Sequence, residues 1–212
     1  ESMSFLKWFA WLFALGVVIV TLETLTYEIR KVDPTRERAQ DIGTAGTITD
    51  RYDSIFRKYT RTYFGRMPWS WFKAQAIQES SLQAYAESPV GAMGLMQIMP
   101  ATFQEIRGEL GLPNTPFDPE TNIKAGIHYN LKCFNFWIED RSFPEQLKLM
   151  FASYNAGAGN ILRAQNTVRQ RNLCDGKHWD CIQQGLSEVT GRHSKETIHY
   201  VDRIEDYFAV IQ

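Results

Sequence analysis

The sequence predicts a mainly α-helical protein with a single domain, preceded by an N-terminal hydrophobic helix. Apolar residues recur at three- and four-residue spacing in one segment after another, which is the period of an α-helix. Glycines and prolines separate these segments, and no stretch alternates polar and apolar residues long enough to predict a sheet. Because 44% of the 212 residues are hydrophobic and 13% are aromatic, the chain can bury one core of ordinary size.

Residues 1–25 are predicted to form a hydrophobic anchor. An uncharged apolar run covers residues 8–22, and Phe5 and Leu6 extend it across Lys7 to nearly the about 20 residues that span a bilayer. A cleaved signal peptide has an apolar region of similar size, but no small-residue cleavage site follows this run before the charged stretch. We therefore expect an uncleaved anchor, with signal cleavage as the alternative.

Residues 26–47 are predicted to form a stalk and linker. Their charges are mixed, and helical periodicity is lost at Asp33-Pro34 and again at residues 43–47, which include two glycines. The folded domain is therefore expected to cover residues 48–212.

The first two helices of this domain are indicated by their apolar faces. One is expected to open near Ile48, with Thr49 as a possible cap. Four of its residues share a face that should be buried: Tyr52, Ile55, Phe56 and Tyr59. The second follows Ser70, a plausible N-cap, and keeps its apolar period up to a last turn that contains Glu79.

Proline and glycine mark the next two helices. One is predicted from Pro100 to Leu110, since proline suits a first helical turn and Gly111 can end the helix. The other begins with Asp118 as N-cap, has a proline in its first turn and runs to about Glu139. Its apolar positions keep helical spacing and predict a central helix: Ile123, Ile127, Leu131, Phe134 and Ile138.

Three further helices complete the prediction. They cover residues 144–154, about 160–171, and a C-terminal stretch that Ser194 caps. The glycines of residues 155–159 stop the first and let the second begin at a new angle. The last helix has a stripe at four-residue spacing that should face inward and place its two polar members in a cleft: Glu196, Tyr200, Ile204 and Phe208.

Charge and cysteine content exclude several classes of protein. With 23 Lys+Arg against 24 Asp+Glu and no long basic block, no nucleic-acid partner is expected. The three cysteines lack the spacing of a metal site. Cys174 and Cys181 flank a short loop, and both a disulfide and two reduced thiols remain open, whereas Cys133 is expected to be a buried free thiol. His128 is expected to be a packed or surface residue.

Glu79 is the candidate general acid. The carbonyl groups at a helix C-terminus disfavour a negative charge, and burial disfavours it further, so a carboxyl group there can stay protonated until a substrate takes its proton. The loop that follows has Gly91 and Gly94, which permit unusual backbone angles and a close approach of ligand to the main chain. Gln97 adds an amide that suits sugar hydroxyls.

Four segments resemble, in order, the motifs of the lytic transglycosylase catalytic domain, a relative of goose-type lysozyme. Glu79-Ser80 resembles the first motif, residues 94–97 (GLMQ) the second and residues 153–157 (SYNAG) the third, while Glu196 and Tyr200 fall where the fourth is expected. The resemblance covers roughly residues 48–212. It implies a lysozyme-like helical domain with a substrate cleft.

The resemblance implies an enzyme that cleaves the β-1,4 bond between N-acetylmuramic acid and N-acetylglucosamine and leaves 1,6-anhydro-muramoyl ends. Glycosidases usually need two carboxyl groups. Here Glu79 is the single well-placed acid, since Glu87 is expected to face solvent. By resemblance Glu79 first protonates the leaving oxygen and then takes the proton of the muramic acid C6 hydroxyl. No metal and no organic cofactor are implied.

The resemblance also implies a set of substrate-binding residues: Ser88, Met96, Gln97, Tyr154, Asn155, Glu196 and Tyr200. Ser88, Gln97 and Asn155 are expected to orient N-acetyl and hydroxyl groups. Met93, Met96 and Tyr154 are expected to desolvate Glu79. The hydroxyl of Tyr154 is further expected to reach the Glu79 carboxyl or the sugar.

The expected partners are peptidoglycan glycan strands and, through the N-terminal helix, the inner membrane, with the catalytic domain facing the cell wall. A secreted or virion-associated protein is the alternative location. A hydrolysing muramidase of the goose-lysozyme type is the alternative chemistry. A non-catalytic wall-binding component of an envelope-spanning or phage assembly is the alternative role.

Overall fold

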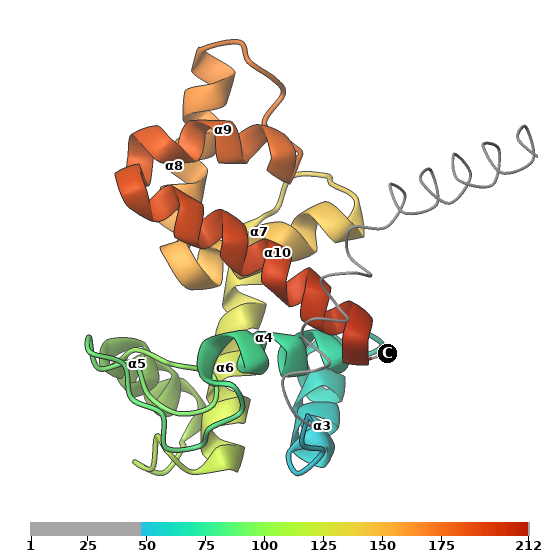
Figure 1. Ribbon diagram of the computed structural model, residues 1–212, viewed down its shortest axis with the longest axis vertical. Helices are drawn as coiled ribbons and strands as arrows, with labels where there is room; N and C mark the ends of the chain where they lie inside the picture. The colour runs from blue at the N-terminus through green and yellow to red at the C-terminus, as the bar shows by residue number, and fades with distance from the viewer. Residues whose placement is uncertain (1–47, 212) are drawn as a thin grey trace, which may run out of the picture. The chain divides into compact units, whose positions relative to one another are not determined.

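The computed structural model describes residues 48–211, and these residues are mainly helical (Figure 1). Its elements are α3 (Asp53–Phe64), α4 (Ser70–Ser80), α5 (Pro100–Leu110), α6 (Pro119–Phe136), α7 (Phe143–Ala156), α8 (Ala158–Gln170), α9 (Trp179–Thr190), the 3-10 helix η1 (Gly191–His193) and α10 (Ser194–Ile211). Within this range there is no strand, and the only sheet-like pairing is two isolated bridges in the loop before α5. The predicted anchor and linker lie outside the described residues.

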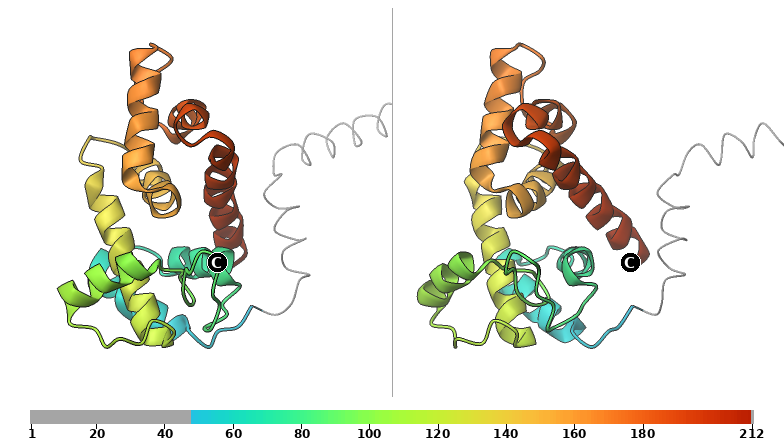
Figure 2. Two further views of the ribbon diagram at one scale, coloured as in Figure 1. Left: turned by 90° about the vertical axis from the view of Figure 1, so that its left-hand side faces the viewer. Right: turned by 60° about the vertical axis from the view of Figure 1, so that its left-hand side comes forward.

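The helices form two groups joined by two long helices. The first group is α3, α4 and α5, which lie beside α6, and the second is α7, α8 and α9, which lie at and above the upper end of α6 (Figure 1). Figure 2 shows α10 running from the second group back to α4. Trp71 of α4 stacks on Phe208 of α10, with ring centroids 3.5 Å apart, so these two helices are held side by side. No helix in residues 48–211 has the length and apolar content needed to cross a bilayer.

The predicted helix signals are confirmed where proline or aspartate marks a start. The α5 helix begins at Pro100 and ends before Gly111, whose backbone is left-handed. The α6 helix begins at Pro119, and the carboxylate of Asp118 accepts the Thr121 N–H at 2.9 Å. The predicted apolar face of α3 is buried too, through Tyr52, Phe56 and Tyr59.

Two predicted caps are wrong by a few residues. Ser70 is the first residue of α4 and makes no capping hydrogen bond, because the helix is entered directly from Trp69. Thr49 accepts the Arg51 N–H at 3.2 Å and so closes a turn before α3. The helix itself starts only at Asp53.

The end of α6 and the whole of α9 differ from the prediction. The α6 helix stops at Phe136 because Trp137 turns inward, where its indole N–H donates to Ser153 Oγ at 3.0 Å. Ile138 is therefore 91% exposed and does not belong to the buried stripe. The α9 helix is absent from the sequence prediction, although it buries Trp179.

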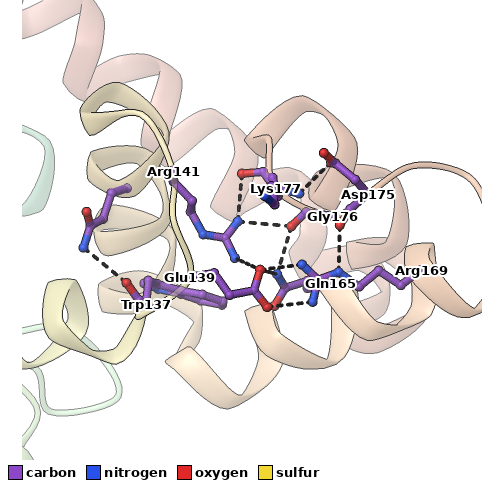
Figure 3. A network of polar contacts seen from close by, with 9 residues as sticks. Trp137, Glu139, Arg141, Gln165, Arg169, Asp175, Gly176 and Lys177 are labelled. Atoms are coloured by element: carbon purple, nitrogen blue, oxygen red, sulfur yellow. Dashed lines mark hydrogen bonds and ion pairs between the residues drawn. The ribbon is translucent and has the colours of Figure 1, made fainter.

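The loop between α8 and α9 is fixed by a disulfide and by a polar network. Cys174 and Cys181 form the disulfide, and Cys133 is a buried free thiol as predicted. Figure 3 shows Arg141 and Gln165 donating to the Gly176 carbonyl oxygen, at 3.1 and 2.9 Å. Such contacts from α8 and the α6–α7 turn hold the loop backbone in addition to the covalent bond.

Candidate active site

Glu79 lies in the last turn of α4, as the sequence predicts, and is partly buried. Its Oε1 accepts a hydrogen bond from the Tyr200 hydroxyl of α10 at 2.5 Å. Burial raises the pKa of Glu79 to about 8, and the Tyr200 hydrogen bond opposes this rise only in part. Because the carboxyl group is neutral at pH 7, it has a proton to give.

The Tyr200 hydroxyl is oriented from behind by two buried amides. Gln75 Nε2 donates to the Tyr200 oxygen at 2.9 Å, and Asn130 Nδ2 donates to Gln75 Oε1 at 2.7 Å. Since Gln75 already donates to this oxygen, the hydroxyl proton of Tyr200 is directed to Glu79. Burial also raises the pKa of Tyr200 well above its usual range, so the hydroxyl keeps that proton.

The sequence prediction missed Gln75 and Asn130. Gln75 is a polar residue in a buried stretch of α4, one helical turn before Glu79. This position alone could have predicted that Gln75 belongs to the site. Asn130 lies on the buried side of α6, far from both in sequence. Only the packing of α4 between α6 and α10 reveals its contact with Gln75.

The loop after α4 is anchored on three helices. Ser80 Oγ donates to the Leu95 carbonyl at 2.9 Å, which ties the end of the Glu79 helix to the loop. Asn122 of α6 accepts the Met96 N–H at 2.8 Å and donates to the Met93 carbonyl at 2.9 Å. The hydroxyl of Tyr154 in α7 donates to the Met96 carbonyl at 2.7 Å.

Gly94 is required at its position in this loop. Its φ is +74°, and a Cβ there would come 2.4 Å from Asn122 Nδ2 and 3.0 Å from the Pro116 carbonyl oxygen. The loop can therefore rest on Asn122 only because residue 94 has no side chain.

We expect Gly94→Ala to lower the free energy of unfolding by about 2–4 kcal/mol, through backbone strain together with overpacking. Urea unfolding measures the change. Gly108→Ala is the matched control, because Gly108 lies in α5 and a Cβ there would have no neighbouring atom within 4 Å. The control should gain up to about 1 kcal/mol, and equal stability of the two variants would contradict the role of Gly94.

Three loop residues that were predicted to bind substrate contribute to the structure of the loop. Ser88 Oγ accepts the Ala92 N–H at 2.9 Å. Gln97 Nε2 donates to the carbonyls of Ala86 and Gly94, at 3.1 and 3.0 Å. The Met96 side chain is fully buried and belongs to the core beneath the loop. Its contact with substrate stays a prediction.

Two predicted orientations are corrected. The Tyr154 hydroxyl is bound to the Met96 carbonyl and does not donate to Glu79, although the ring is close enough for the Glu79 charge to raise the pKa of Tyr154. Glu196 is exposed and pairs with His193 at 3.3 Å, so its side chain does not face inward as the four-residue stripe predicts. Its place in the substrate cleft stays a prediction. Tyr200 is buried where α10 packs on α4, whereas Glu196 lies one turn earlier, next to η1.

Asn155 and Glu196 both line a pocket of about 370 Å³. It lies between the end of α7, the end of α9 and the start of α10. Its polar lining is formed by Asn155, Asn160, Thr190, His193, Glu196 and Thr197. Thr197 Oγ1 donates to Asn155 Oδ1 at 2.8 Å and so fixes this amide.

The described residues offer Glu79 no charged partner. Burial and Tyr200 are the two causes of its pKa shift, and no second carboxylate is among them. Glu87, in the following loop, is exposed as predicted. His128 bonds to Glu109 at 3.0 Å and contacts the Tyr63 ring, which confirms the expected packing role. In residues 48–211 no three His, Cys, Asp or Glu side chains are grouped to hold a metal ion.

The family model of the transglycosylase SLT domain matches residues 55–173, more than half of the chain. The membrane-bound lytic murein transglycosylase F of Desulfosudis oleivorans is 25% identical over 194 residues, which are 78% of this chain and 41% of that protein. The soluble lytic murein transglycosylase of Escherichia coli K12 is 36% identical over 115 residues, which are 52% of this chain and 17% of that protein. The chain thus spans less than half of these relatives.

Solved structures show the same fold. The 70 kDa soluble lytic transglycosylase of Escherichia coli superposes with a TM-score of 0.57 at 29% identity, over 77% of this chain and 24% of that one. The complex of the 70 kDa soluble lytic transglycosylase with bulgecin A gives 0.59 at 27% identity, with the same coverage. An inactive Glu-to-Gln mutant of the lytic transglycosylase Slt from Pseudomonas aeruginosa gives 0.57 at 27% identity, again over 77% and 24%.

Proposed function

The chain belongs to the transglycosylase SLT domain family, and from this premise we propose that it is a peptidoglycan lytic transglycosylase. Its substrate is the β-1,4 bond between N-acetylmuramic acid and N-acetylglucosamine, and its product carries a 1,6-anhydro-muramoyl end. The observation that carries the proposal is the position of the Glu79 carboxyl group, whose Oε1 accepts the Tyr200 hydroxyl at 2.5 Å and whose pKa burial raises to about 8. The inactive Glu-to-Gln mutant of the Pseudomonas relative supports the choice of a glutamate.

In the first step Glu79 transfers its proton to the glycosidic oxygen as the bond from that oxygen to C1 of muramic acid breaks. The electron pair of the bond stays on the departing oxygen, which leaves as a hydroxyl of N-acetylglucosamine. Positive charge develops at C1, and the N-acetyl group of the same sugar supports it. The Glu79 carboxylate formed in this step is stabilised by the Tyr200 hydroxyl.

In the second step the C6 hydroxyl of muramic acid attacks C1, and its proton passes to Glu79. A bond from O6 to C1 forms, and the carboxyl group is again protonated for the next cycle. The nucleophile belongs to the substrate, so the reaction needs neither a second protein carboxylate nor an attacking water molecule. One residue acting as acid and then base calls for a pKa near the working pH.

We expect kcat/KM to be limited on the alkaline side by Glu79. Its pKa of about 8 is raised above the usual value of 4.5, so the proton-bearing form predominates below pH 8 and is lost above it. The rate should therefore fall about tenfold per pH unit above that point. Initial rates on soluble glycan strands between pH 5 and 10 measure this, and a decline that begins near pH 5 would contradict it.

The remaining polar residues extend the binding surface. Asn155, already fixed by Thr197, and Glu196 line the pocket beside α10, where hydroxyl and amide groups of a glycan could be bound. Ser88 and Gln97 act indirectly in this proposal, because their hydrogen bonds shape the loop backbone next to Glu79. Backbone groups of the loop are then available for the N-acetyl group.

The chain is further proposed to consist of an anchor (residues 1–25), a linker (26–47) and the catalytic domain (48–212), with this domain facing the cell wall. The apolar run of residues 8–22 and the membrane-bound relative support this arrangement. Extraction of cell membranes with alkaline carbonate tests it. Retention of the full chain in the pellet is expected, and release into the supernatant would contradict an anchor.

Release of soluble fragments tests the proposed activity. The purified full chain is incubated with purified peptidoglycan, and soluble muramic acid is measured over time. Steady release above a heat-inactivated sample is expected. No release across pH 5–8 would contradict the proposal and favour a wall-binding role.

A further inference from the structure

Three buried side chains behind Glu79 form a chain of hydrogen bonds that starts at the backbone of α6. Asn130 Nδ2 donates to the Gly126 carbonyl oxygen at 3.1 Å and to Gln75 Oε1 at 2.7 Å. Gln75 Nε2 donates to the Tyr200 oxygen at 2.9 Å, and the Tyr200 hydroxyl donates to Glu79 Oε1 at 2.5 Å. Every bond in this chain therefore points from α6 towards the carboxyl group.

The direction of these bonds is fixed at the end that lies farthest from Glu79. The Gly126 carbonyl oxygen can only accept a hydrogen bond, so it requires the NH2 group of Asn130 on its side. That NH2 group also faces Gln75 and requires the carbonyl oxygen of its amide, which leaves the Gln75 NH2 group for the Tyr200 oxygen. Both amides are fully buried, so water does not compete for these bonds.

This direction decides where the proton of the neutral Glu79 carboxyl group lies. Because Oε1 accepts from Tyr200, the proton is on Oε2 and stays free for the glycosidic oxygen. If the Gln75 amide were reversed, its carbonyl oxygen would accept the Tyr200 proton. Glu79 would then donate its own proton to the Tyr200 oxygen, and this proton would no longer be available to a substrate.

The other groups around Glu79 do not set this direction. Among the described residues, the titratable groups that face Glu79 are Tyr200 from α10 and Tyr154 from α7. Burial raises the pKa of both hydroxyls well above the usual range, so both stay neutral and supply no charge. The Tyr154 hydroxyl already donates to the Met96 carbonyl at 2.7 Å. The two amides behind Tyr200 thus determine how the proton of Glu79 is held.

We propose that Asn130 and Gln75, here called the amide relay, are positioning residues that keep the proton of Glu79 on Oε2, where a substrate can take it. The assignment rests on the proposed function for the reaction that this proton serves. The relay also holds the Tyr200 hydroxyl in the direction that stabilises the Glu79 carboxylate formed after proton transfer. It thereby opposes the effect of burial on this acid.

The test replaces both amides of the full chain by apolar side chains of similar size, so that neither amide is left unpaired. Without the relay the Glu79 carboxylate is less stable, and its protonated form persists to higher pH. In Gln75→Leu/Asn130→Leu we therefore expect kcat to fall about three- to tenfold and the alkaline limb to move up by about 0.5–1 pH unit. An alkaline limb at the wild-type position would overturn the proposal.

A second variant carries the test if thermal unfolding shows that the double variant is not folded. Asn130→Leu alone keeps Gln75 but leaves its amide free to turn, so kcat and the alkaline limb should change in the same directions. Gln165→Leu is the matched control. It removes a fully buried amide of α8, which donates to the Gly176 carbonyl at 2.9 Å. This control should lower the unfolding temperature and leave the alkaline limb in place.

A variant without the Tyr200 hydroxyl separates the relay from a general structural effect. In Tyr200→Phe the amides have no hydroxyl to orient, so adding Gln75→Leu/Asn130→Leu should move the alkaline limb no further. Equal movements with and without the hydroxyl would overturn the proposal, because the amides would then act independently of Tyr200.

A titration that needs no activity distinguishes failure of this proposal from failure of the proposed function. The full chain is labelled with ¹³C in its glutamate carboxyl groups, and the Glu79 signal is identified by its absence in Glu79→Gln. The pKa of Glu79 is about 8 in the wild type. A midpoint higher by about 0.5–1 pH unit in Gln75→Leu/Asn130→Leu supports the relay even if no glycan is cleaved. Equal midpoints in the two proteins would overturn it.

Discussion

Glu79→Gln should lower the rate of peptidoglycan cleavage by about 10²–10⁴-fold or more, the scale of positioned proton transfer. Gln keeps the size of the side chain and can still accept the Tyr200 hydrogen bond, but it has no proton to give to the leaving oxygen. Nor can it take a proton from the C6 hydroxyl afterwards. Initial rates of soluble product release per mole of enzyme measure the effect.

Glu87→Gln is the matched control for this substitution. Glu87 is an exposed glutamate in the loop that follows the same helix, and the same change of charge there should leave the rate within about twofold. Thermal unfolding confirms that both variants are folded. A Glu79→Gln protein that keeps a tenth or more of the wild-type rate would contradict the role of Glu79.

Tyr200→Phe should lower kcat by about 10- to 100-fold, since one hydrogen bond to a developing carboxylate is lost. The Tyr200 bond also lowers the pKa of Glu79, so its removal should move the alkaline limb of the pH profile to higher pH. A merely structural loss would reduce the rate without moving this limb. Measuring both kcat and the position of the alkaline limb therefore distinguishes the loss of this hydrogen bond from a structural defect.

Tyr207→Phe is the control for the tyrosine. Tyr207 lies on the same helix, and its hydroxyl accepts from Arg203 at 3.0 Å. We expect a small change in kcat and an unchanged pH profile. A Tyr200→Phe enzyme whose alkaline limb coincides with that of the wild type would contradict the assigned contact with Glu79.

Local patterns in the sequence correctly predict those helix ends that a single residue determines. Pro100 marks a helix start through its fixed φ angle, Asp118 through a capping hydrogen bond, and Gly111 marks a helix end because it lacks a side chain, and the structure confirms all three. The same kind of reasoning places Glu79 in the last turn of its helix. Its raised pKa follows from burial, which the apolar neighbours on the helix already indicate.

Contacts between residues far apart in the sequence cannot be predicted from local patterns. Four-residue spacing groups Glu196 with Tyr200, but only Tyr200 meets α4, because α10 extends past the end of that helix towards η1. Gln75 and Tyr200 are 125 residues apart, so no local pattern can pair them. The sequence predicts the Tyr154 hydroxyl at the Glu79 carboxyl or at the sugar, whereas in the structure this hydroxyl donates to the Met96 carbonyl and supports the loop.

The missed α9 helix has a different cause. Its apolar residues keep helical spacing, but the helix begins inside the loop that the Cys174–Cys181 disulfide closes, and the residue before it makes no capping hydrogen bond. Gly185 in its middle also argues against a helix on propensity alone. The structure explains this glycine, because a Cβ there would come 2.7 Å from the Ala164 carbonyl oxygen of α8.

The mass of the soluble products tests the proposed reaction most directly. Purified peptidoglycan is digested with the full chain, and the released muropeptides are analysed by mass spectrometry without prior reduction. We expect 1,6-anhydro-muramic acid ends, which are one water lighter than reducing ends, because the C6 hydroxyl is the nucleophile. Reducing muramic acid ends would contradict the single-acid mechanism and assign the protein to the hydrolysing muramidases.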